Sequence, residues 1–398
     1  MSDLPEPHHP GRETGQGLSS PGRPWSLLPA APSPRSLGLV LLLSCLALAL
    51  PACARRSYPP QPYLAFVASA GSHSVAAVNL ESFRVVASIP VAPQPEQLAV
   101  RPGSREVYVT AASGHLEVIS FPDLRVIRTL RVGRGARDLR FSRDGRQAYV
   151  LDPGEGQIVF LDGEASKVLA RVSVGAPLSS LALTPDGKTL VAASSHTSRI
   201  FFVSVEARKV LGAVEVGKEP GPMVITADGS KVLVADTGEE KISSADIATR
   251  RILSHIEIGA KPTALILKPD GGELFVLCAQ ASTLVIVDPY RDNVSQTITT
   301  GREPGAAVSR RDSSVLYIAN SGDGSITTFD VQNRLVVAST HTGAQPRALA
   351  LTPDERFLVA VDSAASSLAI LRTDRPALVT TIPVGTRPVD VVVPDWLK

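Results

Sequence analysis

Seven glycines recur at an unbroken spacing of 42 residues and divide most of the chain into equal units: Gly133, Gly175, Gly217, Gly259, Gly301, Gly343 and Gly385, with Ala92 at the first equivalent position. Such a spacing is typical of repeat proteins. A unit of this length with only short apolar runs cannot bury its own hydrophobic face, so each unit must pack against its neighbours. The spacing therefore constrains the architecture more strongly than the function.

Each unit contains four short runs rich in Val, Ile and Leu, separated by clusters of Gly, Asp, Pro or Ser. In one unit the runs are Met223–Ile225, Val232–Ala235, Ile242–Asp246 and Ile252–Ile258. The last run alternates between apolar and polar residues, as expected of an outer strand with one wet face. No ten-residue window favours a helical period. Four strands in about 40 residues, repeated along a chain, predict the blade of a β-propeller.

Aspartates mark the turns between these strands, which we name a, b, c and d from the channel outward. An Asp side chain can accept hydrogen bonds from the backbone of its own turn, and a following Gly tolerates positive φ. The a–b turns carry Asp144, Asp186, Asp228, Asp270, Asp312 and Asp354, and four c–d turns carry Asp162, Asp246, Asp288 and Asp330. We interpret both columns as turn chemistry.

The chain ends decide the number of blades. Residues 63–398 make eight units of 42, beginning with a strand b at 64–68 and ending with an unaccompanied strand a at 389–393. We therefore predict an all-β propeller of four-stranded antiparallel blades, with eight blades favoured and seven possible if one unit is irregular. The C-terminal strand a would join the N-terminal strands b, c and d, and this closure would remove an exposed sheet edge.

The first 62 residues differ in kind from the repeats. The apolar stretch Leu37–Leu50 follows Arg35 and fits the core of a secretory signal peptide. It leads into Leu50-Pro51-Ala52-Cys53, which resembles the lipobox of bacterial lipoproteins. We expect a leader at 1–53 with lipidation of Cys53, a Pro-rich spacer at 54–62, and the propeller at 63–398. Cleavage after Ala54 is the alternative and would release a soluble protein.

Export follows from either form of cleavage. The expected locations are the outer membrane, as a lipoprotein, or the periplasm or extracellular space, with membrane contact through a lipid anchor only. The balance of 40 Lys plus Arg against 38 Asp plus Glu gives a net charge of +2, which does not indicate nucleic-acid binding. Cys278 is the one cysteine beyond the leader, so no disulfide is expected within the propeller, and a buried, inert thiol is favoured.

Several segments resemble the YVTN-type β-propeller repeat: Val107–Thr110, Ala148–Leu151, Thr184–Gly187, Val216–Pro220 and Leu316–Asn320. The resemblance covers residues 63–398. Members of that family include periplasmic propellers and archaeal surface-layer proteins. The resemblance therefore implies an envelope-associated scaffold or binding protein rather than a reaction. It also implies seven blades more often than eight, and the eight units counted here depart from that.

Signatures of catalysis are sparse. His255 and His341 fall on outward-facing positions of d strands, whereas His73, His115 and His196 fall in scattered b–c loops without a partner at metal-ligand spacing. The chain contains no G-x-S-x-G elbow, no H-E-x-x-H, no P-loop and no C-x-x-C-H. We expect no catalytic residue, no metal and no cofactor.

Charged residues gather on one predicted rim, which the d–a and b–c loops share. Glu96, Arg137 and Arg347 share the phase of the start of strand a and are expected to line the channel mouth. Arginines there would capture an anionic glycan, a peptide carboxylate or a partner loop. Alternatively, the acids cap their own turns and the bases keep the face soluble. The candidate binding residues are Glu96, Arg134, Arg137, Asp152, Lys218, Asp236, Lys261, Arg302, Asn320, Arg347, Asp362 and Arg387.

Two functional hypotheses follow. The first is a non-catalytic cell-envelope propeller that binds a protein or polysaccharide partner through this rim. The alternative is a lactonase-like or lyase-like propeller enzyme with a site at the channel mouth, because the propeller fold also supports catalysis. Catalysis predicts that a loop histidine or a channel carboxylate lies within hydrogen-bond reach of a second titratable group in a deep pocket.

Overall fold

A computed structural model describes residues 63–175 and 177–396, which lie in the second of two compact units, Pro60–Lys398. The leader at 1–53, its proposed lipidation site Cys53 and the spacer at 54–62 lie outside the described residues. The described part of the chain is built from 32 β-strands. It contains no helix that could cross a lipid bilayer.

The first four blades occupy the N-terminal half of the propeller. The first contains β1 (Leu64–Ser69), β2 (Ser74–Asn79), β3 (Arg84–Pro90) and β32 (Pro388–Val392). The second contains β4 (Pro95–Val100), β5 (Glu106–Ala111), β6 (His115–Ser120) and β7 (Arg125–Arg131). The third contains β8 (Arg137–Phe141), β9 (Gln147–Asp152), β10 (Gln157–Asp162) and β11 (Val168–Ser173). The fourth contains β12 (Ser180–Leu183), β13 (Thr189–Ser194), β14 (Arg199–Ser204) and β15 (Lys209–Glu215).

The remaining four blades repeat the same strand order. The fifth contains β16 (Pro220–Ile225), β17 (Lys231–Asp236), β18 (Lys241–Asp246) and β19 (Arg251–Glu257). The sixth contains β20 (Ala264–Leu267), β21 (Leu274–Cys278), β22 (Thr283–Asp288) and β23 (Asn293–Thr299). The seventh contains β24 (Pro304–Ser309), β25 (Val315–Asn320), β26 (Ser325–Asp330) and β27 (Leu335–His341). The eighth contains β28 (Pro346–Leu351), β29 (Phe357–Asp362), β30 (Ser367–Arg372) and β31 (Ala377–Pro383).

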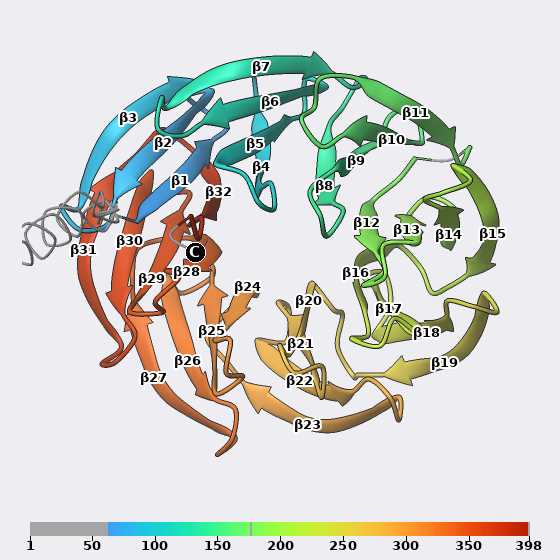
Figure 1. Ribbon diagram of the computed structural model, residues 1–398. Coiled ribbons are helices and arrows are strands. Elements are labelled where there is room, and N and C mark those ends of the chain that lie inside the picture. The colour runs from blue at the N-terminus through green and yellow to red at the C-terminus, as the bar shows by residue number, and fades with distance from the viewer. Residues whose placement is uncertain (1–62, 176, 397–398) are drawn as a thin grey trace, which may run out of the picture. The chain divides into compact units, whose positions relative to one another are not determined.

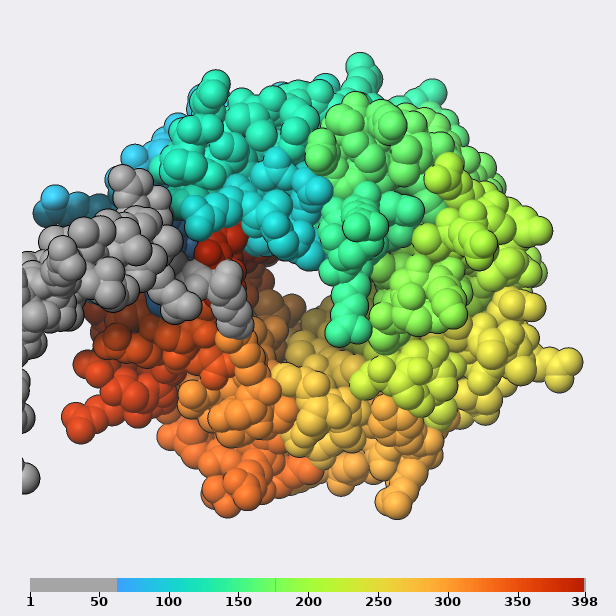
Figure 2. Space-filling view, viewed as in Figure 1, coloured from blue at the N-terminus to red at the C-terminus, as the bar shows by residue number. Residues whose placement is uncertain are grey.

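These eight antiparallel sheets stand around a central channel, which Figure 1 shows from one end and Figure 2 shows as an opening through the ring. The predicted all-β, eight-bladed propeller is confirmed. The strand nearest the C-terminus, β32, pairs antiparallel with β1, with Phe66 opposite Val392 and Val67 opposite Val391. The first blade is therefore assembled from both ends of the repeat region, and no blade lacks its innermost strand.

The hydrophobic core lies between blades rather than within one. One cluster joins Val67 and Val78 of the first blade to Val359 and Val361 of the eighth, and all four side chains are fully buried. Burial of each such side chain contributes roughly 1.5–3 kcal/mol. Removing a blade would expose two faces at once, so the ring is stable only as a whole.

The aspartates predicted to close the turns do so. In all six a–b turns the Asp side chain accepts a hydrogen bond from the backbone N–H two residues later, at 2.9–3.1 Å. In the c–d turns the carboxylates of Asp162, Asp246, Asp288 and Asp330 also accept backbone N–H groups of their own turns. These columns are explained by hairpin closure.

The glycine column has a steric cause in several blades. A Cβ added at Gly133 would lie 1.7 Å from Oδ2 of Asp152, and one added at Gly343 would lie 1.8 Å from Oδ2 of Asp362. Both aspartates are buried at the end of a b strand. Asp152 accepts hydrogen bonds from the next two N–H groups of the d–a loop, those of Arg134 and Gly135, at 3.1 and 3.2 Å. The glycine lets the loop approach this carboxylate.

Two glycines of the same column act differently. Gly175 and Gly259 have φ angles of +77° and +70°, and a Cβ at either position would meet nothing within 4 Å. The b strands of their blades end in Ser194 and Cys278 instead of an acid. There the glycine is required by its left-handed backbone conformation.

Side chains at the channel also connect neighbouring blades. Asp390 in β32 accepts the N–H of Leu98 in β4 at 2.7 Å, and Gln97 in β4 accepts the N–H of Leu139 in β8 at 2.8 Å. These hydrogen bonds join the innermost strands of the first three blades. The carboxylate of Asp390 is largely buried, and this burial raises its pKa to about 6 against the opposing effect of the Leu98 and Val391 N–H groups.

The raised pKa of Asp390 predicts a specific dependence of stability on pH. Because the folded protein holds this proton more tightly than the unfolded chain, the contribution of the group is greatest near pH 4 and is lost as the pH rises through about 6. The loss amounts to about 3 kcal/mol for a shift of this size. Denaturant unfolding at pH 4.5, 6 and 8 should show wild type losing stability relative to Asp390→Asn as the pH rises. A stability difference between the two proteins that stays constant, or changes in the opposite direction, would contradict this assignment.

Candidate functional site

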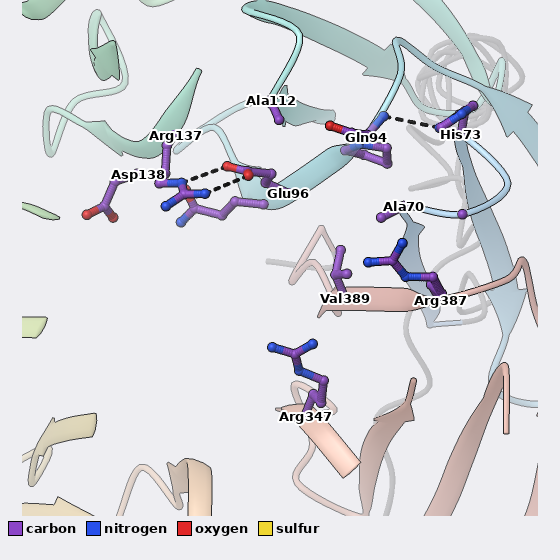
Figure 3. A pocket seen from close by; sticks show the side chains of 13 residues that line it. Ala70, His73, Gln94, Glu96, Ala112, Arg137, Asp138, Arg347, Arg387 and Val389 are labelled. Carbon is purple, nitrogen blue, oxygen red and sulfur yellow. Dashed lines mark hydrogen bonds and ion pairs between the residues drawn. The ribbon is translucent and has the colours of Figure 1, made fainter. Parts of the chain in front are cut away.

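A cavity of about 710 Å³ opens at the end of the channel where the d–a and b–c loops lie. The first, second, third and eighth blades contribute to it, so it sits off the centre of the ring and spans the point where the two ends of the chain meet. Figure 3 shows the side chains that converge on it. Its lining consists of Ala70, Gly71, His73, Gln94, Pro95, Glu96, Gln97, Ala112, Arg137, Asp138, Arg347, Arg387 and Val389.

Two arginines enter this cavity without an acidic partner. Arg347 is the second residue of β28, and Arg387 directly precedes β32; both are exposed. In Figure 3 their guanidinium groups extend into the space from the same side. Among the described residues, the arginine of this cavity that pairs with an acid is Arg137, with Glu96. Two such cations near one another attract an anion that can accept hydrogen bonds from both.

The third arginine of the cavity is neutralised. Arg137, the first residue of β8, donates from Nε and Nη2 to the two carboxylate oxygens of Glu96 in β4, at 2.8 and 2.7 Å. Hydrogen bonding to Glu96 raises the pKa of Arg137 further. The pair fixes the Glu96 carboxylate on the side of the cavity opposite Arg347, as Figure 3 shows.

The pairing follows from the blade order. Glu96, Arg137 and Arg347 occupy equivalent positions at the start of strand a in the second, third and eighth blades. Glu96 and Arg137 come from adjacent blades and therefore meet. The equivalent positions on either side of Arg347 are Gly305 and Val389, which offer no carboxylate. Arg347 therefore has no carboxylate beside it at the equivalent positions of the neighbouring blades.

His73 contributes a hydrogen-bond donor. It lies in the b–c loop of the first blade, and its Nδ1 accepts the backbone N–H of Gln94 at 3.1 Å. A neutral imidazole whose Nδ1 accepts a hydrogen bond carries its proton on Nε2. In this tautomer Nε2 of His73 can donate a hydrogen bond but offers no lone pair.

Asp138 also lines the cavity, but its carboxylate is bound by protein groups. Its Oδ2 accepts the N–H of Leu181 at 2.6 Å, and its Oδ1 lies 2.6 Å from Nη2 of Arg140. Burial raises the pKa of Asp138, although Arg140 and the Leu181 N–H oppose the shift. Its φ of 55° lies in the left-handed region. We assign this residue to positioning of β8.

The twelve residues predicted for the rim fall into three groups. Glu96, Arg137, Arg347 and Arg387 line the cavity together. Arg134, Lys218, Lys261 and Arg302 lie elsewhere on the d–a loops and do not reach it; Arg134 pairs with Glu155 at 2.5 Å and Lys218 with Glu239 at 3.6 Å. Asp152, Asp236, Asn320 and Asp362 are buried beneath the loops.

Two of these buried acids, Asp152 and Asp362, hold loops that lead into cavity residues. Asp362 accepts hydrogen bonds from the N–H groups of Ala344 and Gln345, just before Arg347. Asp236 accepts one from Ser243 at 2.7 Å, and burial raises its pKa to about 6. Sequence reasoning did not assign His73, Gln94, Gln97 or Asp138 to the site. A usable signal existed for Gln97 and Asp138, because they are polar at the channel phase of strand a, next to Glu96 and Arg137.

Within residues 63–175 and 177–396, no group of three or more His, Cys, Asp or Glu side chains is placed to hold a metal ion. Cys278 is fully buried, and this burial raises the pKa of its thiol to about 11, so it is not a reactive thiolate at neutral pH. The cavity contains the cations of Arg347 and Arg387 and a carboxylate, that of Glu96, which Arg137 holds in place.

Similarity searches connect the chain to propellers of known and unknown function. A family model described as "Lactonase, 7-bladed beta-propeller" matches residues 162–381, more than half of the chain. Protein NirF of Pseudomonas aeruginosa is 33% identical over 89 residues. That match spans 22% of this chain and only 23% of the length of NirF.

Solved structures share the fold. The dihydro-heme d1 dehydrogenase NirN, solved in complex with DHE, superposes with a TM-score of 0.73 at 16% identity, over 85% of this chain and 78% of that one. A functionally unknown protein from Desulfotomaculum acetoxidans gives a TM-score of 0.58 at 16% identity, over 70% of this chain and 95% of that one. Identities this low show the fold alone.

These findings correct the first functional hypothesis. The prediction of a non-catalytic envelope scaffold is wrong, because the family model that matches more than half of the chain is that of a lactonase. The family match agrees better with the alternative hypothesis, a lactonase-like propeller. Although its ring has eight blades, the chain belongs to the lactonase, 7-bladed β-propeller family.

Proposed function

We propose that this protein is a lactonase-like hydrolase that opens a carboxylate-bearing lactone at the channel mouth. The observation that carries the proposal is the arrangement of the cavity, in which the unpaired Arg347 and Arg387 face a Glu96 carboxylate held by Arg137. The family match supports lactone chemistry. The cations determine which lactones fit, because a cavity with two free arginines favours anionic substrates.

Substrate binding begins with Arg347 and Arg387. Their guanidinium groups donate charge-assisted hydrogen bonds to the carboxylate of the substrate, each group worth about 1.5–3 kcal/mol. The Nε2–H of His73 adds a neutral donor, suited to a carbonyl or ring oxygen of the lactone. Together these contacts would orient the lactone in the cavity.

Glu96 is the candidate general base. A carboxylate offers about four lone-pair positions, and Arg137 occupies two of them. The remaining positions accept a proton from a water molecule as it attacks the lactone carbonyl carbon. The new C–O bond forms, the ring C–O bond breaks, and the proton passes to the departing ring oxygen. The product is the open hydroxy acid.

A second candidate ligand is a tetrapyrrole. It is favoured by the similarity to NirN, which was solved with DHE, and by the local match to NirF. The acidic side chains of a haem-type macrocycle fit Arg347 and Arg387 in the same way as a lactone carboxylate. His73 does not fit as an iron ligand, because its Nδ1 accepts the Gln94 N–H and its Nε2 therefore carries a proton. The protein would therefore recognise a tetrapyrrole through the carboxylates of the macrocycle and not through its iron.

A panel of lactones with and without a carboxylate tests the proposal by the proton release that follows ring opening. We expect turnover of carboxylated members. Glu96→Gln should lower kcat about hundredfold or more, because it removes the base. Arg347→Ala combined with Arg387→Ala should raise KM at least tenfold with a smaller effect on kcat. Arg291→Ala, on an exposed c–d turn of the sixth blade, is the control and should leave both constants unchanged.

The same variants separate the two candidates. Absence of turnover for every lactone, or turnover that Glu96→Gln leaves unchanged, would contradict the hydrolase. Absorbance titration with a haem-type tetrapyrrole then decides between them. Saturable binding that the double arginine variant abolishes, without lactone turnover, favours the tetrapyrrole.

We further infer that the protein is exported as a lipoprotein with YVTN-type repeats. The support is the apolar stretch Leu37–Leu50, the lipobox-like Leu50–Cys53 and the repeated segments such as Val107–Thr110. Cys53→Ser should abolish incorporation of a labelled fatty acid and release the protein from membranes. A variant that remains membrane-bound would refute the anchor.

A further inference from the structure

The opposite end of the channel contains a second cavity, of about 500 Å³, beside the a–b turns of the third, fourth and fifth blades. It shares no lining residue with the cavity at the channel mouth. The two lie along the same strand, β8, which contributes Arg137 to the mouth and Arg140 and Phe141 to this second cavity. The two cavities can therefore hold separate ligands.

The walls of the second cavity are mainly apolar. Leu183 of β12 and Met223 and Ile225 of β16 line it together with Phe141, and all four side chains are partly exposed. Elsewhere the described core consists largely of fully buried side chains. A flexible methionine among branched residues adapts to the shape of an inserted apolar chain.

Cations stand beside this apolar wall. Arg140 is fixed, since it donates from Nε to the Leu181 carbonyl at 3.1 Å and pairs with Asp138 at 2.6 Å. Arg143 lies in the a–b turn of the third blade. The equivalent positions in the a–b turns of the fourth and fifth blades are Pro185 and Ala227, which carry no charge. Within the described residues, Arg143 makes no ion pair.

The two nearby acids form their ion pairs with other cations, Asp144 with Arg146 at 3.7 Å and Asp186 with Lys188 at 3.9 Å. The carboxylate of Asp144 in the same turn accepts the Ser142 hydroxyl at 2.7 Å and the Arg146 N–H at 3.0 Å. In the next turn the carboxylate of Asp186 accepts the Thr184 hydroxyl at 2.6 Å and the Lys188 N–H at 3.0 Å. A free guanidinium therefore borders an apolar cavity. This combination matches a ligand with an acidic head and a hydrocarbon tail.

We propose that this second cavity binds a linear alkyl carboxylate of the fatty-acid type. The carboxylate pairs with Arg143, and the chain lies against Leu183, Met223 and Ile225. The walls are hydrocarbon, so affinity should rise about fourfold with each methylene that they cover. Because Arg143 is positively charged, the cavity should bind the carboxylate more tightly than the alcohol of the same chain length.

Calorimetric titration of the protein with dodecanoate below its micelle-forming concentration, dodecanol below its solubility limit, and butanoate tests the proposal. We expect one saturable site for dodecanoate, with dodecanol about tenfold weaker and butanoate at least a hundredfold weaker. Arg143→Ala should weaken dodecanoate about tenfold and leave dodecanol unchanged. Met223→Gln should weaken both, because it places a polar amide on the wall at nearly unchanged volume.

The double variant Arg347→Ala with Arg387→Ala is the control for the other cavity and should bind dodecanoate like wild type. Because it disables the channel mouth, its behaviour separates this site from the proposed hydrolase. Three results would overturn the proposal: no saturable binding of dodecanoate, a stoichiometry well above one, or affinity that Arg143→Ala leaves unchanged. Loss of binding in the double variant instead of in Arg143→Ala would assign the alkyl carboxylate to the mouth.

Discussion

A buried polar side chain at the end of strand b binds the loop that enters the same blade, and much of the propeller depends on this contact. In the third and eighth blades the side chain is Asp152 or Asp362, and it accepts two backbone N–H groups of the loop. The approach is so close that only glycine fits opposite the carboxylate. The glycines that recur every 42 residues are therefore required in part by the buried acids that face them. Each buried carboxylate would destabilise the fold by several kcal/mol if it had no hydrogen-bond partner.

The contact between the buried acid and the loop also positions residues of the cavity. The loops that Asp152 and Asp362 hold lead directly into Arg137 and Arg347 of the channel mouth. Ring closure then adds His73 and Arg387 from the first blade, which the two ends of the repeat region build together. A rigid scaffold therefore carries short loops whose side chains differ from blade to blade. The off-centre cavity and its mixture of free and paired arginines arise from those differences.

The 42-residue period was sufficient to predict the blades, their number and the turn aspartates, because each follows from local spacing. It also placed Glu96, Arg137 and Arg347 at the channel mouth. It did not reveal the role of His73, since its contact with Gln94 depends on how adjacent blades meet. Nor did residue types distinguish Asp362, buried beneath a loop, from an exposed rim acid. That distinction depends on burial, which turn-like sequence patterns do not report.

A double-mutant cycle on Gly343 and Asp362 tests the central contact most directly. The φ of Gly343 lies outside the left-handed region, so Gly343→Ala is costly only through its clash with the Asp362 carboxylate. The account predicts that Asp362→Ala relieves most of this cost, giving a coupling free energy of about 1–3 kcal/mol in denaturant unfolding. The matched cycle on Gly259 and Cys278 should show no coupling, because the φ of Gly259 is +70° and its added Cβ would meet nothing. Additive effects at Gly343 and Asp362 would contradict the account.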